Sequence, residues 1–537
     1  MNDLVLTNGR FHTQDPGCAG ATAVAIRDGR FRVVGSDADA RTQAGAGAKV
    51  IDLGGRLVLP GLTDCHVHYY DWAMGRRRLM LAGLPSLGRL VEQVAEAARK
   101  AAPGAWVVGL GWNETEWTEP RMPLRGDLDR VAPDHPVLLW RSDLHLAVVN
   151  SRALELAGIG DHRADPPMGV IDKDPAGRPT GILRDLAINL ASQRIPAAPD
   201  AEVAQAFKDG FPCMHRIGLT GVQDQRLMGG PEGAPAFRAW QGLRAEQQVD
   251  LRVWMNIPSE RLTEAIALGL RTGMGDDYLR VGHCKYFSDG AQGSHTAWML
   301  APYEDADTTG LALTPMEAIE DGLRRAHGAG IAIAVHAIGD RANRELSLAF
   351  QRVLGESGSA AVAPPRAPHR IEHMQLIRQE DLRRITKLGV ASSVQPLSVT
   401  DDIPIMEPLI GSRTQYAHAW RSMLDAGLLL AFGSDCPVTD PNPFWGIHAA
   451  VTRRKRDGSP RQGWHPEQCL TVAEAVWGYT MGAAVITGRE HDQGTISPGK
   501  LADLVVVDRD IFSIDPMEIF QAKPALTVFD GRVVYES

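Results

Sequence analysis

The sequence predicts an α/β fold: a (β/α)8 TIM-like barrel joined to a small β-sandwich domain formed by the N- and C-terminal segments. Three observations support this prediction. Apolar strand-like runs alternate with helical patterns through the middle of the chain. Short β-type runs with Asn-Gly and Asp-Gly turns occupy both ends. Residues of the types that bind metals follow several of the middle runs, where the active sites of such barrels lie.

The two ends of the chain carry the same kind of β pattern. In residues 1–59, Asn8-Gly9 and Asp28-Gly29 separate short apolar runs, and in residues 485–537 Asp530-Gly531 does the same. Such dipeptides between apolar runs are a strong hairpin signal. Isolated hairpins are only marginally stable, so we expect both segments to meet in one small sheet domain.

The middle of the chain, residues 60–484, is expected to form the barrel. The strand candidates are 106–111, 136–140, 219–223, 251–255, 279–286, 331–336, 369–373, 389–394 and 428–432. Helical patterns lie between several of them, for example at 316–328 and 342–354. The stretch from about 72 to 205 is long for a single βα step, so we expect an insertion there that covers the barrel mouth.

Composition excludes several classes of protein. The 537 residues include 56 basic and 65 acidic side chains, a net charge of −9, which argues against a nucleic acid partner. The N-terminus lacks the pattern of a signal peptide, and no apolar run approaches the ~18 residues that span a bilayer. The six cysteines show no CxxC spacing. We therefore expect a cytoplasmic protein with a small-molecule substrate and no membrane partner, and a homodimer as the default assembly.

The first candidate for chemistry is the pair His66 and His68 at the end of an apolar run. Side chains alternate faces along a strand, so both histidines point the same way and Cys65 and Val67 point the other. Two imidazoles on one face of a strand end can form half of a metal site. An HxH pattern alone also occurs by chance, so the interpretation depends on the rest of the chain.

Later strands supply residues that could complete such a site. Lys285, His336, His373 and Asp435 each lie at or just after the end of a predicted strand. Singly, each could be a hydrogen-bonded loop residue or a helix cap. In a barrel, however, the C-terminal strand ends converge on one active site, and the combination favours a shared function.

This set resembles the metal-dependent amidohydrolase superfamily. The local sequence is most similar to the branch that includes the N-substituted formamide deformylases. The resemblance runs nearly end to end and rests on the stretches 60–68 (PGLTDCHVH), 109–114 (GLGWNE), 285–291 (KYFSDGA), 335–342 (VHAIGDRA), 370–373 (RIEH) and 433–438 (GSDCPV).

The resemblance implies a ligand set of His66, His68, Lys285, His336, His373 and Asp435. The HxH pair and Asp435 would bind one divalent metal, and the two later histidines a second. Lys285 would bridge them as a carbamate formed with carbon dioxide. These donors suit zinc first, ahead of manganese, iron or nickel, and one or two metals per chain fit the set. Asp435 would also act as the catalytic base.

Other residues near the strand ends are candidates for contact with substrate. They are Trp112, His145, Asp289 and Arg341. No role is assigned to Asp185, which follows a short strand-like run. By strand alternation, Cys65, Cys284 and Cys436 should face the surrounding helices as core thiols and not as ligands.

The sequence therefore predicts a metal-dependent hydrolase of non-peptide carbon–nitrogen bonds, acting on an N-substituted formamide or N-acyl amine. A deaminase, or a hydrolase of cyclic amides or esters, fits the same barrel. A metal-free binding protein on this scaffold is the alternative from another class. Motifs of serine hydrolases, zincins and nucleotide-binding proteins are missing from the sequence.

Overall fold

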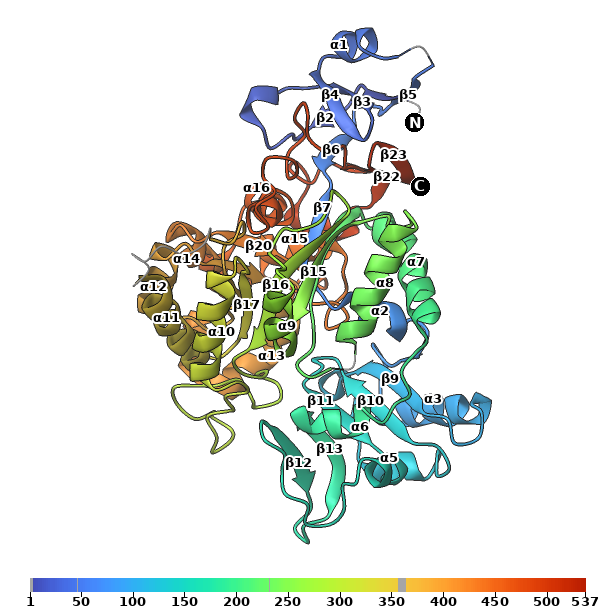
Figure 1. Cartoon of the computed structure of the whole chain (residues 1–537), viewed down its shortest axis with the longest axis vertical. Helices are drawn as coiled ribbons and strands as arrows, with labels where there is room; N and C mark the ends of the chain where they lie inside the picture. Colours follow the sequence, from blue (N-terminus) through green and yellow to red (C-terminus); the bar gives the residue numbers. More distant parts are fainter. Residues whose placement is uncertain (1–2, 46, 231, 356–363) are drawn as a thin grey trace.

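The computed structural model describes residues 3–45, 47–230, 232–355 and 364–537. Its centre is an eight-stranded sheet in which neighbouring strands are parallel (Figure 1). In spatial order the strands are β7 (Leu62–Val67), β14 (Leu219–Asp224), β15 (Arg252–Pro258), β16 (Leu279–Phe287), β17 (Ile333–Ala337), β18 (Arg370–His373), β19 (Ala391–Val394) and β20 (Leu430–Phe432). The predicted barrel is confirmed.

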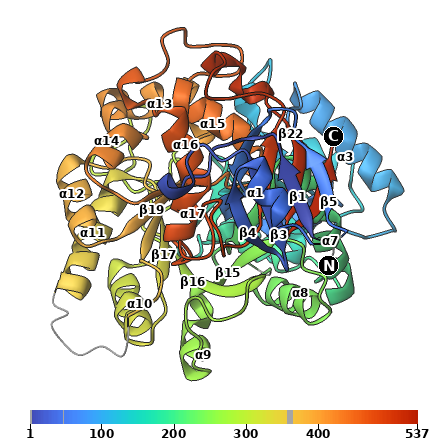
Figure 2. The ribbon, with the colours of Figure 1, turned by 90° about the horizontal axis from the view of Figure 1, so that it is seen from above.

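Helices follow the barrel strands and form an outer layer (Figure 2). They are α2 (Tyr69–Gly75), α7 (Asp200–Arg216), α8 (Gly233–Ala245), α9 (Leu262–Ala267), α10 (Met316–Gly328), α11 (Asp340–Gly355), α12 (Gln379–Lys387), α13 (Ser398–Ile410), α14 (Trp420–Asp425), α15 (Pro443–Thr452), α16 (Val472–Tyr479) and α17 (Met481–Val485). Except for α17, whose Ala483 belongs to a smaller cluster, these helices pack their apolar faces on the strands in one large cluster of buried side chains, as binary patterning requires.

The barrel closes between its first and last strands. The chain just after β20 runs beside β7, and Val67 and Cys436 form an isolated parallel bridge. The amide of Asp435 donates to the carbonyl of His66 at 2.6 Å, and the amide of His68 donates to the carbonyl of Cys436 at 2.8 Å. Closure therefore brings the two ends of the predicted ligand set side by side.

A six-stranded sheet, called the insertion sheet below, lies between α2 and α7 in sequence. Its order is β12 (Gly169–Lys173), β13 (Pro179–Asp185), β11 (Leu146–Val149), β10 (Val137–Arg141), β9 (Val107–Trp112) and β8 (Leu79–Met80). The strand candidates at 106–111 and 136–140 belong to this sheet and not to the barrel. Separate apolar clusters, which include side chains of α3 (Leu87–Lys100) and α5 (Ser151–Leu156), pack against it.

Strands from both ends of the chain pair with one another. A four-stranded sheet holds β4 (Arg30–Gly35), β3 (Ala23–Arg27), β1 (Leu4–Thr7) and β5 (Lys49–Asp52), and a five-stranded sheet holds β2 (Arg10–Phe11), β6 (Leu57–Pro60), β21 (Leu504–Val507), β22 (Pro524–Phe529) and β23 (Arg532–Glu536). One apolar cluster takes side chains from both sheets. The division of the chain into a sandwich domain and a barrel domain stays a prediction.

Two of the three expected hairpins form. Asp28 and Asp530 have φ of 51° each, and the glycines that follow also have positive φ, as tight hairpin turns require. They join β3 to β4 and β22 to β23. Asn8-Gly9 differs: it carries the chain from β1 in one sheet to β2 in the other, because β1 is already paired on both edges by β3 and β5.

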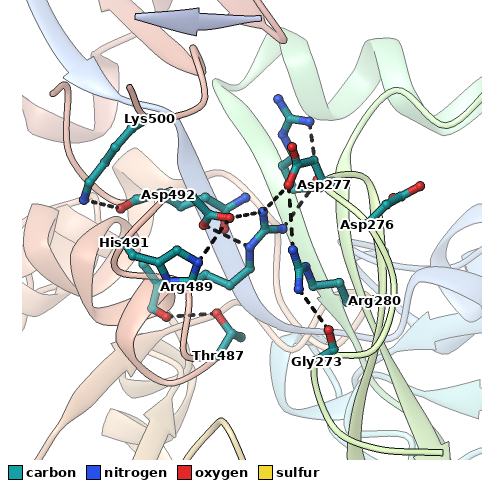
Figure 3. Close-up of polar contacts among 12 residues, drawn as sticks. Gly273, Asp276, Asp277, Arg280, Thr487, Arg489, His491, Asp492 and Lys500 are labelled. Atoms are coloured by element: carbon teal, nitrogen blue, oxygen red, sulfur yellow. Dashed lines mark hydrogen bonds and ion pairs between the residues drawn. The ribbon is translucent and has the colours of Figure 1, made fainter. Parts of the chain in front are cut away.

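Ion pairs fasten the C-terminal segment to the barrel. Arg252 of β15 contacts Asp503 at 2.8 Å and Asp530 at 3.0 Å. Figure 3 shows a second group, in which Arg489 lies between Asp492, at 2.7 Å, and Asp277, at 3.2 Å. Because a buried charge that loses its partner is costly, the pairs of Arg252 with Asp503 and Asp530 hold the segment after α17 against the barrel, and the Arg489–Asp277 pair adds a half-exposed contact between the same two parts.

Among the described residues, no helix has both the length and the apolar character needed to cross a bilayer.

Candidate metal centre

The structure brings all six predicted ligands to one end of the barrel. They come from six positions: His66 in β7, His68 just before α2, Lys285 in β16, His336 in β17, His373 at the end of β18, and Asp435 after β20. All six side chains line one cavity. The rings of His66 and His373 are 4.7 Å apart, and those of His336 and His373 are 4.4 Å apart, centre to centre.

The tightest group is His66, His68 and Asp435. Nε2 of each histidine lies 3.2 Å from Oδ1 of Asp435, and one potential ligand atom from each residue falls within 4.8 Å of the others. Burial works against ionisation of Asp435, but His66 and His68 outweigh it and hold its pKa well below the usual range. The group thus presents two imidazoles and a carboxylate, a donor set that suits a divalent metal.

Three of the four candidate histidines, His66, His336 and His373, are arranged as metal ligands are. Nδ1 of His66 lies 2.7 Å from Oε2 of Glu372, Nδ1 of His373 lies 2.7 Å from Oε1 of Gln395, and Nε2 of His336 lies 3.0 Å from the carbonyl of Gly290. All three partners are acceptors, so each histidine donates its N–H there and keeps the lone pair of its other nitrogen free. This is the arrangement found in metal-binding histidines.

Several buried polar atoms at the centre make no hydrogen bond in the part of the chain that the structure describes. They are Nε2 of His66, Nδ1 of His68, Nζ of Lys285 and Oδ1 of Asp435. Buried polar atoms are normally satisfied, so atoms left without hydrogen bonds at one point indicate a missing ligand. Burial also lowers the pKa of Lys285 to about 8 and the pKa of His373 to about 3. The residues present therefore fit a cationic group.

Two of the ligands have unusual backbone geometry. His373 has φ of 70° and Asp435 has φ of 61°, in the left-handed region that costs energy for residues other than glycine. Both lie where a strand has just ended, so the change of direction turns the side chain toward the barrel mouth. Strain held at a strand end in this way is typical of a functional site.

The cavity above the ligands has a volume of about 590 Å³, within the range of small-molecule sites. Barrel residues form its floor, and the loop 140–145 and the segment 185–198 of the insertion form part of its wall. Apolar side chains also line the cavity, among them Leu186 and Ile195 of this segment and Leu227 and Met228, which follow β14. The cavity can therefore hold an apolar substituent beside the polar centre.

Of the four predicted substrate contacts, the structure brings His145 to this cavity. Its Nδ1 lies 2.6 Å from Oδ1 of Asp185, and its ring lies 5.2 Å from that of His336. Burial disfavours a charged ring, but the hydrogen bond and the charge of Asp185 outweigh it and raise the pKa of His145. Asp185, to which the sequence assigned no role, is thus its partner.

The other three predicted substrate contacts do not line the cavity. Trp112 is fully buried in the insertion sheet, where Nε1 donates to the carbonyl of Leu139. Asp289 accepts hydrogen bonds from the amides of Trp298, Ile338 and Gly339. The guanidinium of Arg341 lies 4.8 Å from the ring centre of Trp298.

The cysteines beside the ligands are buried thiols. Cys65, Cys284 and Cys436 are at most 2% exposed and belong to apolar clusters. Burial raises the pKa of each thiol, so all three stay protonated. None of them lines the cavity.

Sequence reasoning missed the residues that hold the ligands in place. Glu372 contacts His66, and Arg370 in turn contacts Glu372 at 2.5 Å, with both side chains fully buried. Arg370 also donates to Gln223 and to the carbonyl of Cys65. Two charged residues spaced i, i+2 on a buried strand were the available signal, because a strand inside a barrel rarely carries charge unless it is paired.

Comparison with known proteins adds a family and a fold. A family model described as the amidohydrolase family matches residues 49–535. YtcJ of Bacillus subtilis (strain 168) is 32% identical over 518 residues, 96% of each chain. The N-substituted formamide deformylase of Arthrobacter pascens is 28% identical over 551 residues, 100% of this chain and 99% of that one. A crystal structure of an uncharacterized metal-dependent hydrolase from Pyrococcus horikoshii OT3 matches with a TM-score of 0.77 and 24% identity, over 96% of this chain and 99% of the other.

Proposed function

The chain belongs to the amidohydrolase family and is a hydrolase of carbon–nitrogen bonds, and we propose that its substrates are linear amides of the N-substituted formamide or N-acyl amine type. One observation carries this proposal: His66, His68 and Asp435 converge on the floor of a small-molecule cavity, and each has a buried polar atom there that makes no hydrogen bond to the described residues. The likeness to an N-substituted formamide deformylase supports the substrate class.

His66, His68 and Asp435 would hold one divalent cation, His336 and His373 would hold a second, and Lys285 would be a ligand shared by both. When bound, such a cation lowers the pKa of water and polarises a carbonyl group. Zinc suits the imidazole and carboxylate donors best, and manganese, iron and nickel also accept them.

Lys285 contributes most simply as a carbamate. Its Nζ is buried among the ligands without a hydrogen bond, and a protonated amine there would repel the cations. The neutral amine can form an N–C bond with carbon dioxide and release one proton, which yields an anionic oxygen ligand that can reach both positions. The low pKa of Lys285 favours the neutral amine that this reaction needs.

Asp435 is the proposed general base. Its Oδ1 lies between the two HxH rings at the cavity floor, where it can take a proton from the attacking water. It can then deliver that proton to the leaving nitrogen, so that the amine departs neutral. The acyl group departs as a carboxylic acid, which releases its remaining proton to the solvent as it becomes a carboxylate.

The experiment that tests the substrate class is a screen for amine release and acid production by the metal-loaded enzyme. Formamides, N-acyl amino acids, lactams and aryl esters form the panel. We expect turnover of linear amides that is lost on chelation and restored by added metal. Turnover restricted to lactams or esters would instead place the chain among cyclic amide or ester hydrolases.

A binding protein without catalysis makes a different prediction. It would hold less than about one equivalent of metal after careful loading and would turn over none of the panel. Measurement of bound metal and of carbon dioxide released on acid denaturation would also test the carbamate on Lys285.

The variant Asp435→Asn tests the proposed base. It should keep most of the fold and lose nearly all turnover, because the amide cannot accept the proton. Near wild-type activity in this variant at equal metal content would exclude the role.

A further inference from the structure

The insertion sheet delivers one side chain into the cavity beside the proposed ligands. His145 lies just before β11, and its ring centre is 5.2 Å from that of His336. Its amide donates to Oδ1 of Asp143 at 3.0 Å, and Oδ2 of Asp143 accepts from Arg141 and Ser294. The backbone that carries His145 is therefore fixed on both sides.

The ring of His145 is held by a single buried carboxylate. Asp185 is at the end of β13, its side chain is 1% exposed, and its amide donates to the carbonyl of His145 at 2.9 Å. The side-chain contact, Nδ1 to Oδ1, is 2.6 Å. The other oxygen of Asp185, Oδ2, has no hydrogen bond in the described part of the chain, so the carboxylate serves His145 alone.

The backbone conformation of Asp185 also indicates that the His145–Asp185 pair has a function. It has φ of 46° and ψ of −127°, a conformation that is costly for a residue with a side chain. A Cβ at Gly290 would lie 2.1 Å from Oγ1 of Thr296 and 3.0 Å from Oδ1 of Asp185, so a side chain there would clash with Thr296 and crowd the carboxylate. The carbonyl of the same glycine accepts from His336. One loop thus positions a proposed ligand and the His145–Asp185 pair together.

Because a carboxylate can only accept, Nδ1 of His145 must carry a hydrogen. When the ring is neutral, Nε2 has a lone pair. The side-chain hydrogen bond of His145 to the described residues is the one from Nδ1 to Asp185, and the side chain lines the cavity. An amide offers a carbonyl oxygen, which the cationic centre attracts, and an N–H, which needs an acceptor. We infer that Nε2 of His145, oriented by Asp185, accepts the N–H of the scissile amide and so selects secondary over tertiary amides.

This inference rests on the proposed function and narrows it to substrates with a hydrogen on the scissile nitrogen. His145 is the contacting residue, and Asp185 acts through it by fixing the tautomer. Replacing the carboxylate by an amide should reverse the ring, since the Asn side chain can donate to Nδ1 and leave Nε2–H facing the substrate. The same logic applies when the aspartate of a Ser-His-Asp triad is replaced by asparagine.

The test compares N-benzylformamide with N-benzyl-N-methylformamide in the metal-loaded enzyme. The assay is run at about pH 9, above the ordinary range for histidine, because the pKa of His145 is raised and the inference needs the neutral ring. The added methyl group has a steric cost, but that cost is common to all variants. Wild type should prefer the secondary amide, and Asp185→Asn should lower kcat/KM for it by about 10- to 100-fold, the usual effect of an unpaired polar group. The tertiary amide should change by less than about threefold.

Two further variants separate positioning from folding. Asp185→Glu keeps an acceptor for Nδ1 and should retain most of the selectivity. Asp172→Asn removes a carboxylate of the neighbouring strand β12, which pairs with Arg184 at 2.8 Å and does not line the cavity, so it should leave selectivity unchanged. Metal content should be equal in all variants.

Equal loss of both amides in Asp185→Asn, or unchanged selectivity, would overturn the inference and leave the proposed function standing. Equal rates for both amides in wild type would do the same. Failure of wild type to hydrolyse either amide, with metal bound, would count against the proposed substrate class, and the inference would fall with it.

Discussion

Glu372→Gln should weaken metal binding without touching a proposed ligand. The carboxylate of Glu372 accepts from Nδ1 of His66 at 2.7 Å and contacts Arg370, and all three side chains are fully buried. It therefore fixes the His66 tautomer and increases the basicity of its Nε2. Glutamine keeps the size of the side chain and removes the charge.

The expected magnitude follows from two contacts. Loss of a carboxylate behind a ligating histidine costs about 10- to 100-fold in metal affinity, which is about 1.4–2.7 kcal/mol. Arg370 would keep Gln223 and the carbonyl of Cys65 as partners but lose its only buried counter-ion in the described chain. A buried charge that loses its partner costs about 3–5 kcal/mol, so the variant should also unfold more easily.

The assay is competition for zinc against a chelator of known affinity, with thermal unfolding measured on the same samples. Glu380→Gln is the matched control, because Glu380 lies on α12 with its side chain 59% exposed. Zinc affinity of Glu372→Gln within about twofold of wild type, well short of the 10-fold minimum expected, would refute the reasoning that this carboxylate supports the centre.

Three other predictions follow from buried charges and from the proposed cation. Burial raises the pKa of Glu232 to about 8, so the folded state holds a proton that the unfolded state releases near pH 4.5. The free energy of unfolding should therefore fall from about pH 5 to pH 8. In denaturant titrations, Glu232→Gln should flatten that fall. Arg252→Ala should cost about 3–5 kcal/mol because it leaves Asp503 and Asp530 buried without their common partner, and a midpoint of unfolding equal to wild type would contradict this. Removal of metal by chelation should lower the thermal midpoint, and added zinc at about 100 times its Kd should restore about 2.7 kcal/mol; an unchanged midpoint would argue against binding to the folded chain.

The barrel and its six candidate ligands were predictable from the sequence because both depend on local patterns. Apolar runs mark the strands, and residues such as Lys285 and His336 lie directly at strand ends, where the topology of a parallel barrel brings them together. His373 and Asp435 were also found by position, although their left-handed backbone, which sets where they point, leaves no mark in the sequence.

The supporting residues could not be predicted because their contacts are long-range. Glu372 contacts His66 across the barrel. Asp185, on β13, contacts His145, which precedes the neighbouring strand β11. Trp112 shows how a position near a strand end can mislead, because it was predicted as a substrate contact and does not line the cavity. It lies close in sequence to a strand end, but that strand belongs to the insertion sheet, so its ring packs in the core of that sheet.

The pairing of β6 with β21 sets the order in which the molecule can be completed during synthesis. Pro60 lies opposite Leu504, more than 400 residues later, which corresponds to about 20–90 s of translation at ordinary rates. Throughout that time the edge of β6 that later pairs with β21 has no partner. An unpaired apolar edge is a site for wrong association. The nascent chain should therefore depend on chaperones most strongly until its last strands emerge.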